Sequence, residues 1–69
     1  MTNMATVTIQ GVYQLNGPKP FKRVIQCDKS EIGYYSQMIG RKIRQAEWIM
    51  ANFPGANTSK GYSVTINIK

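Results

Sequence analysis

The side chains of this chain best suited to proton transfer or nucleophilic attack are three carboxylates and one thiol. The chain contains no histidine. Asp28 and Glu31 stand three residues apart, a spacing that could serve acid–base catalysis or hold a metal, whereas Glu47 is isolated. Most enzyme chemistry near neutral pH uses a histidine, a carboxylate pair or a metal cluster. Because Asp28 and Glu31 fall where a helix is expected to begin, capping and compensation of the helix dipole are their simpler roles. The sequence therefore predicts a protein that is not an enzyme, with no catalytic residue, no metal site and no cofactor.

Cys27 is the single cysteine, so the chain cannot form an internal disulfide, and no Cys/His spacing fits zinc. Without a histidine to act as its base, Cys27 is interpreted as a small apolar residue at a strand end rather than as a reactive thiol. Ser59 and Lys60 are adjacent in a loop, where they rarely align for nucleophile activation. A reducing, cytoplasmic setting without a membrane span is the expectation.

The charge balance is strongly basic, with nine Lys and Arg against three acids and a net charge of +6. Such an excess favours a polyanionic partner, most often nucleic acid, although it is also compatible with mere solubility. No run of five basic residues occurs, so the charges are expected on a folded surface rather than in a disordered basic tail.

Alternating apolar and polar side chains predict three strands, at residues of about 5–15, 20–27 and 61–69. Gly11 interrupts the apolar side of the first strand, which predicts a bulge or a place where a helix side chain packs closely. Asn16-Gly17 follows directly and is the strongest short signal of a hairpin. Pro18 and Pro20 are expected to widen the connection and to stay out of the ladder.

One long helix is expected over about residues 29–52, which would span roughly 36 Å and match the strands in length. Asp28 can cap its start with Glu31 three positions on, and Ser30 is the rival cap. Pro54 follows the last helical residues and cannot continue the hydrogen-bond ladder. At 100° per residue, one continuous apolar stripe is expected to face the sheet, made of Ile32, Tyr35, Ile39, Ile43, Ala46, Met50 and Phe53.

The element order strand, strand, helix, strand constrains the topology of a single domain over residues 1–69, with residues 1–3 as a frayed tail. A right-handed crossover through the helix places the third strand beside the first. The predicted fold class is therefore α+β, a β-β-α-β domain whose three-stranded antiparallel sheet has the order 2-1-3 and packs on one long helix.

A second helix face, opposite the apolar stripe, is expected to point into solvent and consists of Tyr34, Gln37, Arg41, Arg44 and Trp48. Exposed Trp, Tyr and Arg are enriched at binding hot spots, so this face predicts docking to a partner or a homodimer. The alternative is that the 54–61 connection covers Trp48.

Two glycines, Gly33 and Gly40, lie inside the expected helix and with Ala51 form a third, narrow edge. Glycine destabilises a helix interior by about 1 kcal/mol relative to alanine. Their presence therefore predicts the close approach of another backbone or a ligand, although two glycines also occur by chance.

The predicted topology gathers cations at one end of the domain, where the hairpin turn, the helix C-terminus and the start of the third strand meet. These residues are Lys19, Lys22, Arg44 and Lys60, with Trp48 nearby. The leading hypothesis is a nucleic-acid-binding module, in which this basic end contacts phosphates and Arg41 and Trp48 add further contacts. The expected open side of the sheet lacks the aromatic pairs of an RNA-recognition motif, but a polar sheet could lie in a major groove.

The alternative hypothesis is a protein-interaction module that docks the Tyr34/Arg41/Trp48 helix face on a larger protein. Small size, basic charge and a lack of catalytic residues are also typical of small inhibitors and regulators of phages and mobile elements. Net charge favours a nucleic-acid partner, whereas a Trp-centred face with few lysines favours a protein. No small-molecule substrate is expected in either case.

Overall fold

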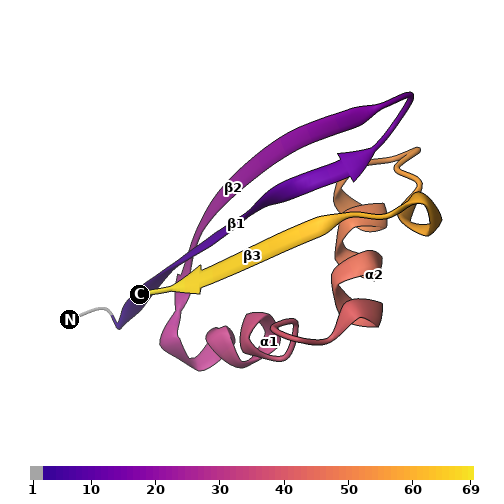
Figure 1. The fold of residues 1–69 in the computed structure, drawn as a ribbon. Helices are drawn as coiled ribbons and strands as arrows, with labels where there is room; N and C mark the ends of the chain where they lie inside the picture. Colours follow the sequence, from indigo (N-terminus) through magenta and orange to yellow (C-terminus); the bar gives the residue numbers. More distant parts are fainter. Residues whose placement is uncertain (1–2) are drawn as a thin grey trace.

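The computed structural model describes residues 3–69, which form a three-stranded antiparallel sheet with two short helices on one side (Figure 1). Along the chain, the elements are β1 (Met4–Gln14), β2 (Pro18–Asp28), the 3₁₀ turn η1 (Lys29–Glu31), α1 (Ile32–Ser36), α2 (Lys42–Asn52), the 3₁₀ turn η2 (Thr58–Lys60) and β3 (Ser63–Ile68). The sheet order β2-β1-β3 confirms the predicted topology and the α+β class. The single long helix is wrong, because the helical segment is divided in two.

The register of the sheet assigns every strand residue to one of two faces. Ala5 lies opposite Cys27, and Val7 lies between Ile25 of β2 and Ile68 of β3. Because side chains alternate along a strand, the odd-numbered residues of β1 and β2 and the even-numbered residues of β3 form one face, toward the helices. We call this the inner face, and we call the opposite one the outer face.

β2 begins at Pro18 and contains Pro20, so both prolines lie within the ladder rather than outside it. The odd-numbered residues of β1 exchange backbone hydrogen bonds with the odd-numbered residues of β2. The 2.8 Å bond from Lys29 N–H to the Asn3 carbonyl continues this pattern just beyond the two strands. The even-numbered residues of β2 therefore direct their backbone nitrogens away from β1. A proline lacks an N–H, so an edge strand accepts it at these positions without losing a ladder bond.

The hairpin turn forms at Asn16-Gly17 as predicted, with positive φ at both residues (54° and 113°) and a 2.9 Å bond from Leu15 N–H to the Gly17 carbonyl. Gly11 is required for a different reason than expected, since the register runs through it without a bulge. A Cβ atom at Gly11 would collide with the backbone carbonyl oxygen of Ser63. The close neighbour is thus the backbone of β3 and not a helix side chain.

The core lies between the inner face and the two helices. Its buried side chains come from all parts of the domain: Ala5, Val7, Ile9, Cys27, Met38, Trp48 and Ile49. Tyr13, Phe21, Trp48 and Phe53 make an aromatic cluster at the hairpin end, in which Tyr13 and Phe53 stack with ring centroids 4.6 Å apart. The prediction that Cys27 is a buried apolar residue is confirmed.

The helical segment breaks between Gln37 and Arg41 because Gly40 adopts a positive φ of 74°, which ends helices in the manner of a left-handed cap. The Met38 carbonyl accepts a 3.2 Å hydrogen bond from Arg41 N–H and a second one, of 2.8 Å, from the side-chain amide of Gln45, which ties the turn to α2. At the start of the segment, Asp28 accepts a bond from Ser30 N–H (3.2 Å), so Asp28 is the cap of η1. Gly40 thus signals a helix break and not the approach of another backbone.

The break changes which side of α2 faces the sheet. The predicted apolar stripe is therefore wrong at the break and along α2. Ile39 is 55 % exposed, Ile43 is 79 % exposed and Met50 is also exposed, whereas Ile49 is buried. The stripe assumed 100° per residue without interruption from residue 32 to 53, and a non-helical turn resets that angle. Its other members are half-buried: Ile32, Tyr35, Ala46 and Phe53.

Candidate functional site

The outer face of the sheet lies opposite both helices, and no element of residues 3–69 packs over it (Figure 1). Its side chains are mainly hydrogen-bonding ones: Thr6, Thr8, Gln10, Gln14, Lys22, Gln26, Ser63, Thr65 and Asn67, with Val12 and Val24 among them. None is aromatic, because the strand aromatics Tyr13 and Phe21 have odd numbers and point inward. Most of this surface is therefore polar, although Met4, Pro18 and Pro20 also hold outer-face positions.

The three carboxylates lie away from most of the sheet. Asp28 and Glu31 stand at the end of β2 and in η1, and Glu47 lies on α2. Residues 5–27 and 48–69, which hold the hairpin, its turn and β3, contain no acid and five cations: Lys19, Lys22, Arg23, Lys60 and Lys69. The sheet half of the domain is therefore uniformly basic.

The basic end expected from the sequence assembles only in part. Lys60 lines a depression of about 410 Å³ together with turn residues, among them Asn16 and Gly17, and Lys19 lies two residues beyond that turn. Lys22 follows further along β2 on the outer face, opposite Gln10. Lys19 and Lys60 thus lie at the hairpin end, whereas Lys22 lies nearer the middle of β2.

Arg44 does not join them, so its predicted place at the hairpin end is wrong. It lies in the first turn of α2, in a cleft with Tyr34 and Met38, about 12 Å along the helix from Asn52 at the hairpin end. The prediction assumed one straight helix over 29–52, and the break at Gly40 shortens and redirects it.

Trp48 is 6 % exposed, so its predicted position on a solvent-facing surface is wrong. It packs against Phe21 (centroids 6.0 Å apart) and edge-on against Phe53 (5.9 Å). These rings come from β2 and from the residue that follows α2. Trp48 is a core residue and offers no ring for stacking on a base.

Arg23 was missed by the sequence reasoning. It occupies an inner-face position opposite Ile9, and its guanidinium carbon stands 5.0 Å from the centroid of the Phe53 ring. A cation over an aromatic face is stabilised by the ring quadrupole, while the charge stays at the surface. The one available signal was that Arg23 shares the alternation phase of Phe21 and Ile25.

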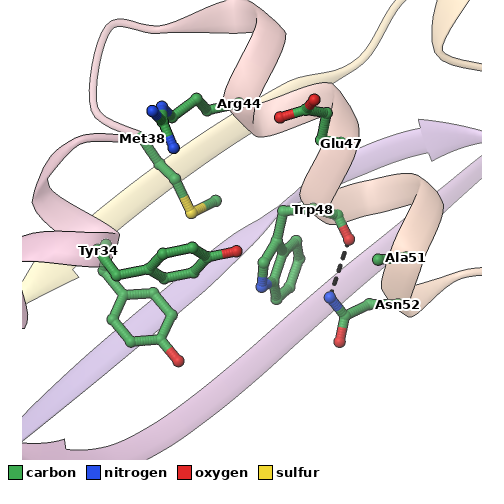
Figure 2. Close-up of a pocket in the computed structure, with 8 residues that line it drawn as sticks. Tyr34, Met38, Arg44, Glu47, Trp48, Ala51 and Asn52 are labelled. Carbon is green, nitrogen blue, oxygen red and sulfur yellow. Dashed lines mark hydrogen bonds between the residues drawn. The ribbon is translucent and has the colours of Figure 1, made fainter. Parts of the chain in front are cut away.

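The cleft between α1 and α2, of about 380 Å³, holds several of the residues that were predicted to form a docking face (Figure 2). Tyr34 from α1 and Arg44 from α2 border it, and the edge of Trp48 forms its floor beside Met38. The Asn52 side chain donates a 2.8 Å bond to the Trp48 carbonyl at the end of the cleft. Burial raises the pKa of the neighbouring Tyr35, and the negative forms of Cys27, Tyr34 and Glu31 raise it further, so its hydroxyl stays neutral at physiological pH.

A second exposed region surrounds the start of α2, where Arg41, Lys42 and Arg44 flank the side chain of Ile43. We call these four residues and the exposed Ile39 the helical corner. The Tyr62 hydroxyl, just before β3, donates a 2.6 Å bond to the Lys42 carbonyl and fixes the corner beside the sheet. Gln37, the remaining residue of the predicted docking face, is exposed in the turn after α1.

Within residues 3–69, no group of three His, Cys, Asp or Glu side chains is arranged to hold a metal ion. None of the helices in this part of the chain is long and apolar enough to cross a membrane. Comparison of the chain with family models, curated proteins and solved structures found no match.

Proposed function

We propose that this protein is a non-enzymatic DNA-binding module that lays the outer face of its sheet on double-stranded DNA. The observation that carries the proposal is the acid-free sheet half, in which Lys22 stands on the uncovered polar face and Lys19 and Lys60 lie at its hairpin end. Phosphate contacts by lysines would position the protein, and side chains of the outer face would meet the base edges.

The dimensions of the face fit a major groove. Two interstrand spacings of about 4.8 Å make the backbone of the sheet roughly 10 Å across, close to the ~12 Å width of the groove in B-form DNA. The side-chain amides of Gln10, Gln26 and Asn67 each carry one donor group and one acceptor group. Such an amide can donate to N7 of an adenine and accept from its N6 amino group in the major groove. Thr8 and Thr65 add hydroxyl groups and methyl groups that suit thymine.

The chemistry of this face favours a duplex over a single strand. Proteins that bind single strands stack bases on exposed aromatic rings, and the outer face has none. The major groove of an RNA duplex is too narrow for side chains to read, which favours DNA over RNA. The sequence-based hypothesis of nucleic-acid binding is kept, but Trp48, Arg41 and Arg44 are replaced by the outer face as the recognition surface.

The proposal is tested by titrating a fluorescently labelled DNA duplex, and the matching single strand, at several salt concentrations. Replacing Lys19, Lys22 and Lys60 together with glutamine should weaken duplex binding, and should lower the slope of log K against log salt by about 1 for each phosphate that is no longer neutralised. The matched control removes the same charge at the helical corner, by replacing Arg41, Lys42 and Arg44 with glutamine, and should change both quantities much less.

Equally weakened binding in the two triple variants would show that net charge, and not this surface, drives association. No duplex binding by the wild-type protein at low salt would contradict DNA binding altogether. Preference for the single strand would contradict the groove-reading part of the proposal.

A second candidate function, docking to a protein, is supported by one specific observation at the helical corner. Ile43 is exposed among Arg41, Lys42 and Arg44, and apolar side chains flanked by Arg are typical of interface hot spots. A partner protein that binds the wild type and the Lys19/Lys22/Lys60 variant, but does not bind Ile43→Asp, would support this function. Retention of that partner by Ile43→Asp would exclude the corner as its docking site.

A further inference from the structure

The two edges of the sheet are unlike, and the difference follows from which backbone groups each strand leaves unpaired. Thr6 and Lys69 exchange both of their backbone hydrogen bonds, at 3.0 and 2.9 Å. In an antiparallel pair such hydrogen-bonded partners alternate with non-bonded ones. Asn67, Thr65 and Ser63 therefore bond to β1, whereas Val64, Ile66 and Ile68 direct their N–H and C=O groups to the open side.

None of these outward groups has a partner in the part of the chain that the structure describes. The hydrogen bonds outside the regular ladders include none to Val64, Ile66 or Ile68. The side chains of the same three residues face inward and are only half-buried. The β3 edge thus has both unpaired backbone and an incompletely covered apolar side.

The opposite edge, on β2, is protected in the usual ways. Pro18 and Pro20 remove two outward N–H groups, and Lys22 and Arg23 place charges along the same stretch. Natural sheets use prolines and charges in this manner to prevent strand addition. Between Ser63 and Ile68, β3 has neither a proline nor a charge, so an added strand would meet no such obstacle.

We propose that β3 pairs with β3 of a second copy of this chain, antiparallel across a two-fold axis at Ile66, to form a continuous six-stranded sheet. In this register Val64 lies opposite Ile68 of the partner subunit, and Ile66 lies opposite its own copy. These are the residues with outward backbone groups, so each of the three donates one and accepts one hydrogen bond. The proposal does not depend on DNA binding; a six-stranded sheet is roughly 24 Å across, so in the dimer only part of the outer face would enter a major groove.

The side chains of β3 are complementary to themselves in this register. On the inner face, Val64, Ile66 and Ile68 meet the same apolar residues and extend the core across the axis. On the outer face, Thr65 meets Asn67 of the partner subunit, and Lys69 meets the neutral Ser63 of the partner subunit. Like charges are therefore never opposed, and a slip by one residue would place polar side chains against apolar ones.

Charge placement tests the register directly, by sedimentation of the wild type and of two double variants. Thr65→Lys with Asn67→Lys places lysine opposite lysine across the axis and should convert dimer into monomer. Thr65→Lys with Asn67→Glu places lysine opposite glutamate and should retain or strengthen the dimer. The matched control, Val24→Lys with Gln26→Lys, adds the same two charges on the outer face of β2 and should leave the dimer unchanged.

Amide hydrogen exchange tests the same proposal on the wild-type protein and does not depend on the folding of any variant. The amides of Val64, Ile66 and Ile68 should be protected at high protein concentration and exchange rapidly on dilution. Those of Thr65 and Asn67, which bond to β1, should be protected throughout.

A protein that stays monomeric at its highest soluble concentration would overturn the proposal. So would a dimer that persists with Thr65→Lys and Asn67→Lys, or one that dissociates equally with lysine and with glutamate at position 67. Unchanged exchange of the Val64, Ile66 and Ile68 amides on dilution would contradict it independently.

Discussion

The inner and outer faces of the sheet are made by alternate residues of the same strands, yet they have opposite chemistry. On β1, Val7 and Ile9 are buried against the helices, while Thr8 and Gln10 between them point to an uncovered polar surface. The inner face also provides the aromatic cluster around Phe21, whereas the outer face of the three strands has no aromatic side chain. One strand thus contributes to stability with one set of residues and presents a surface with the other, so the two roles should separate by mutation.

The largest expected effect is on stability, at Ile9 in the centre of the inner face. Ile9 is fully buried, so Ile9→Ala should lower the free energy of unfolding by about 2–5 kcal/mol, a large share of the total stability of a domain this small. Urea denaturation followed by Trp48 fluorescence measures the change. Thr8→Ala on the outer face is the matched control and should change it by less than about 0.5 kcal/mol. Equal effects at the two positions would contradict the assignment of the faces.

Gly11 is the inner-face position where any side chain should be harmful. A Cβ atom would collide with the Ser63 carbonyl, and backbone cannot move aside as a flexible side chain can. Gly11→Ala should therefore destabilise by about 1–3 kcal/mol and weaken the pairing of β1 with β3. Gly33→Ala in α1 is the control, because a Cβ there meets no atom within 4 Å and the change should not destabilise. Thermal unfolding of both variants checks the pair, and an unaffected Gly11→Ala protein would mean that β3 lies elsewhere.

A smaller effect is expected at residues that helical periodicity wrongly assigns to the inner face. For an uninterrupted helix, Ile39→Ala and Ile43→Ala would each cost about 2–5 kcal/mol, as for buried residues. Because both side chains are exposed, each change should instead alter the free energy of unfolding by less than about 0.5 kcal/mol. Ile49→Ala on the buried side of the same helix should be strongly destabilising. The reverse ranking in denaturant titrations would restore the uninterrupted helix.

The strands could be predicted from the sequence because apolar and polar side chains alternate with a period of two residues, a pattern that is visible within a few residues. Alternation in β3, together with Asn16-Gly17 and the handedness of the crossover, is sufficient for the sheet order. The phase of a helix accumulates along its length, so the break at Gly40 displaces later assignments such as Ile43, Trp48 and Met50, although Phe53 still packs against the core. Ile43 and Trp48 therefore exchange the places expected for them, one exposed and the other buried.

The candidate site was predictable to the same extent. Lys19 and Lys60 lie at the hairpin end and Lys22 lies farther along β2, and the sheet order is sufficient to place all three. Arg44 depends on the course of the helix and was misplaced with it. Arg23 shares the alternation phase of Phe21 and Ile25, but its charge obscures that pattern, and the register with β1 is what places it on the inner face.

The proposed contact between the outer face and DNA can be observed through the NMR signals of side-chain amides. In a two-dimensional NMR titration with duplex DNA, the amide groups of Gln10, Gln26 and Asn67 report on the outer face, whereas those of Gln45 and Asn52 report on the helical layer. We expect the three outer-face signals to shift on addition of DNA, while the Gln45 and Asn52 signals stay in place. Shifts confined to Gln45 and Asn52, with the outer-face signals unchanged, would contradict this contact.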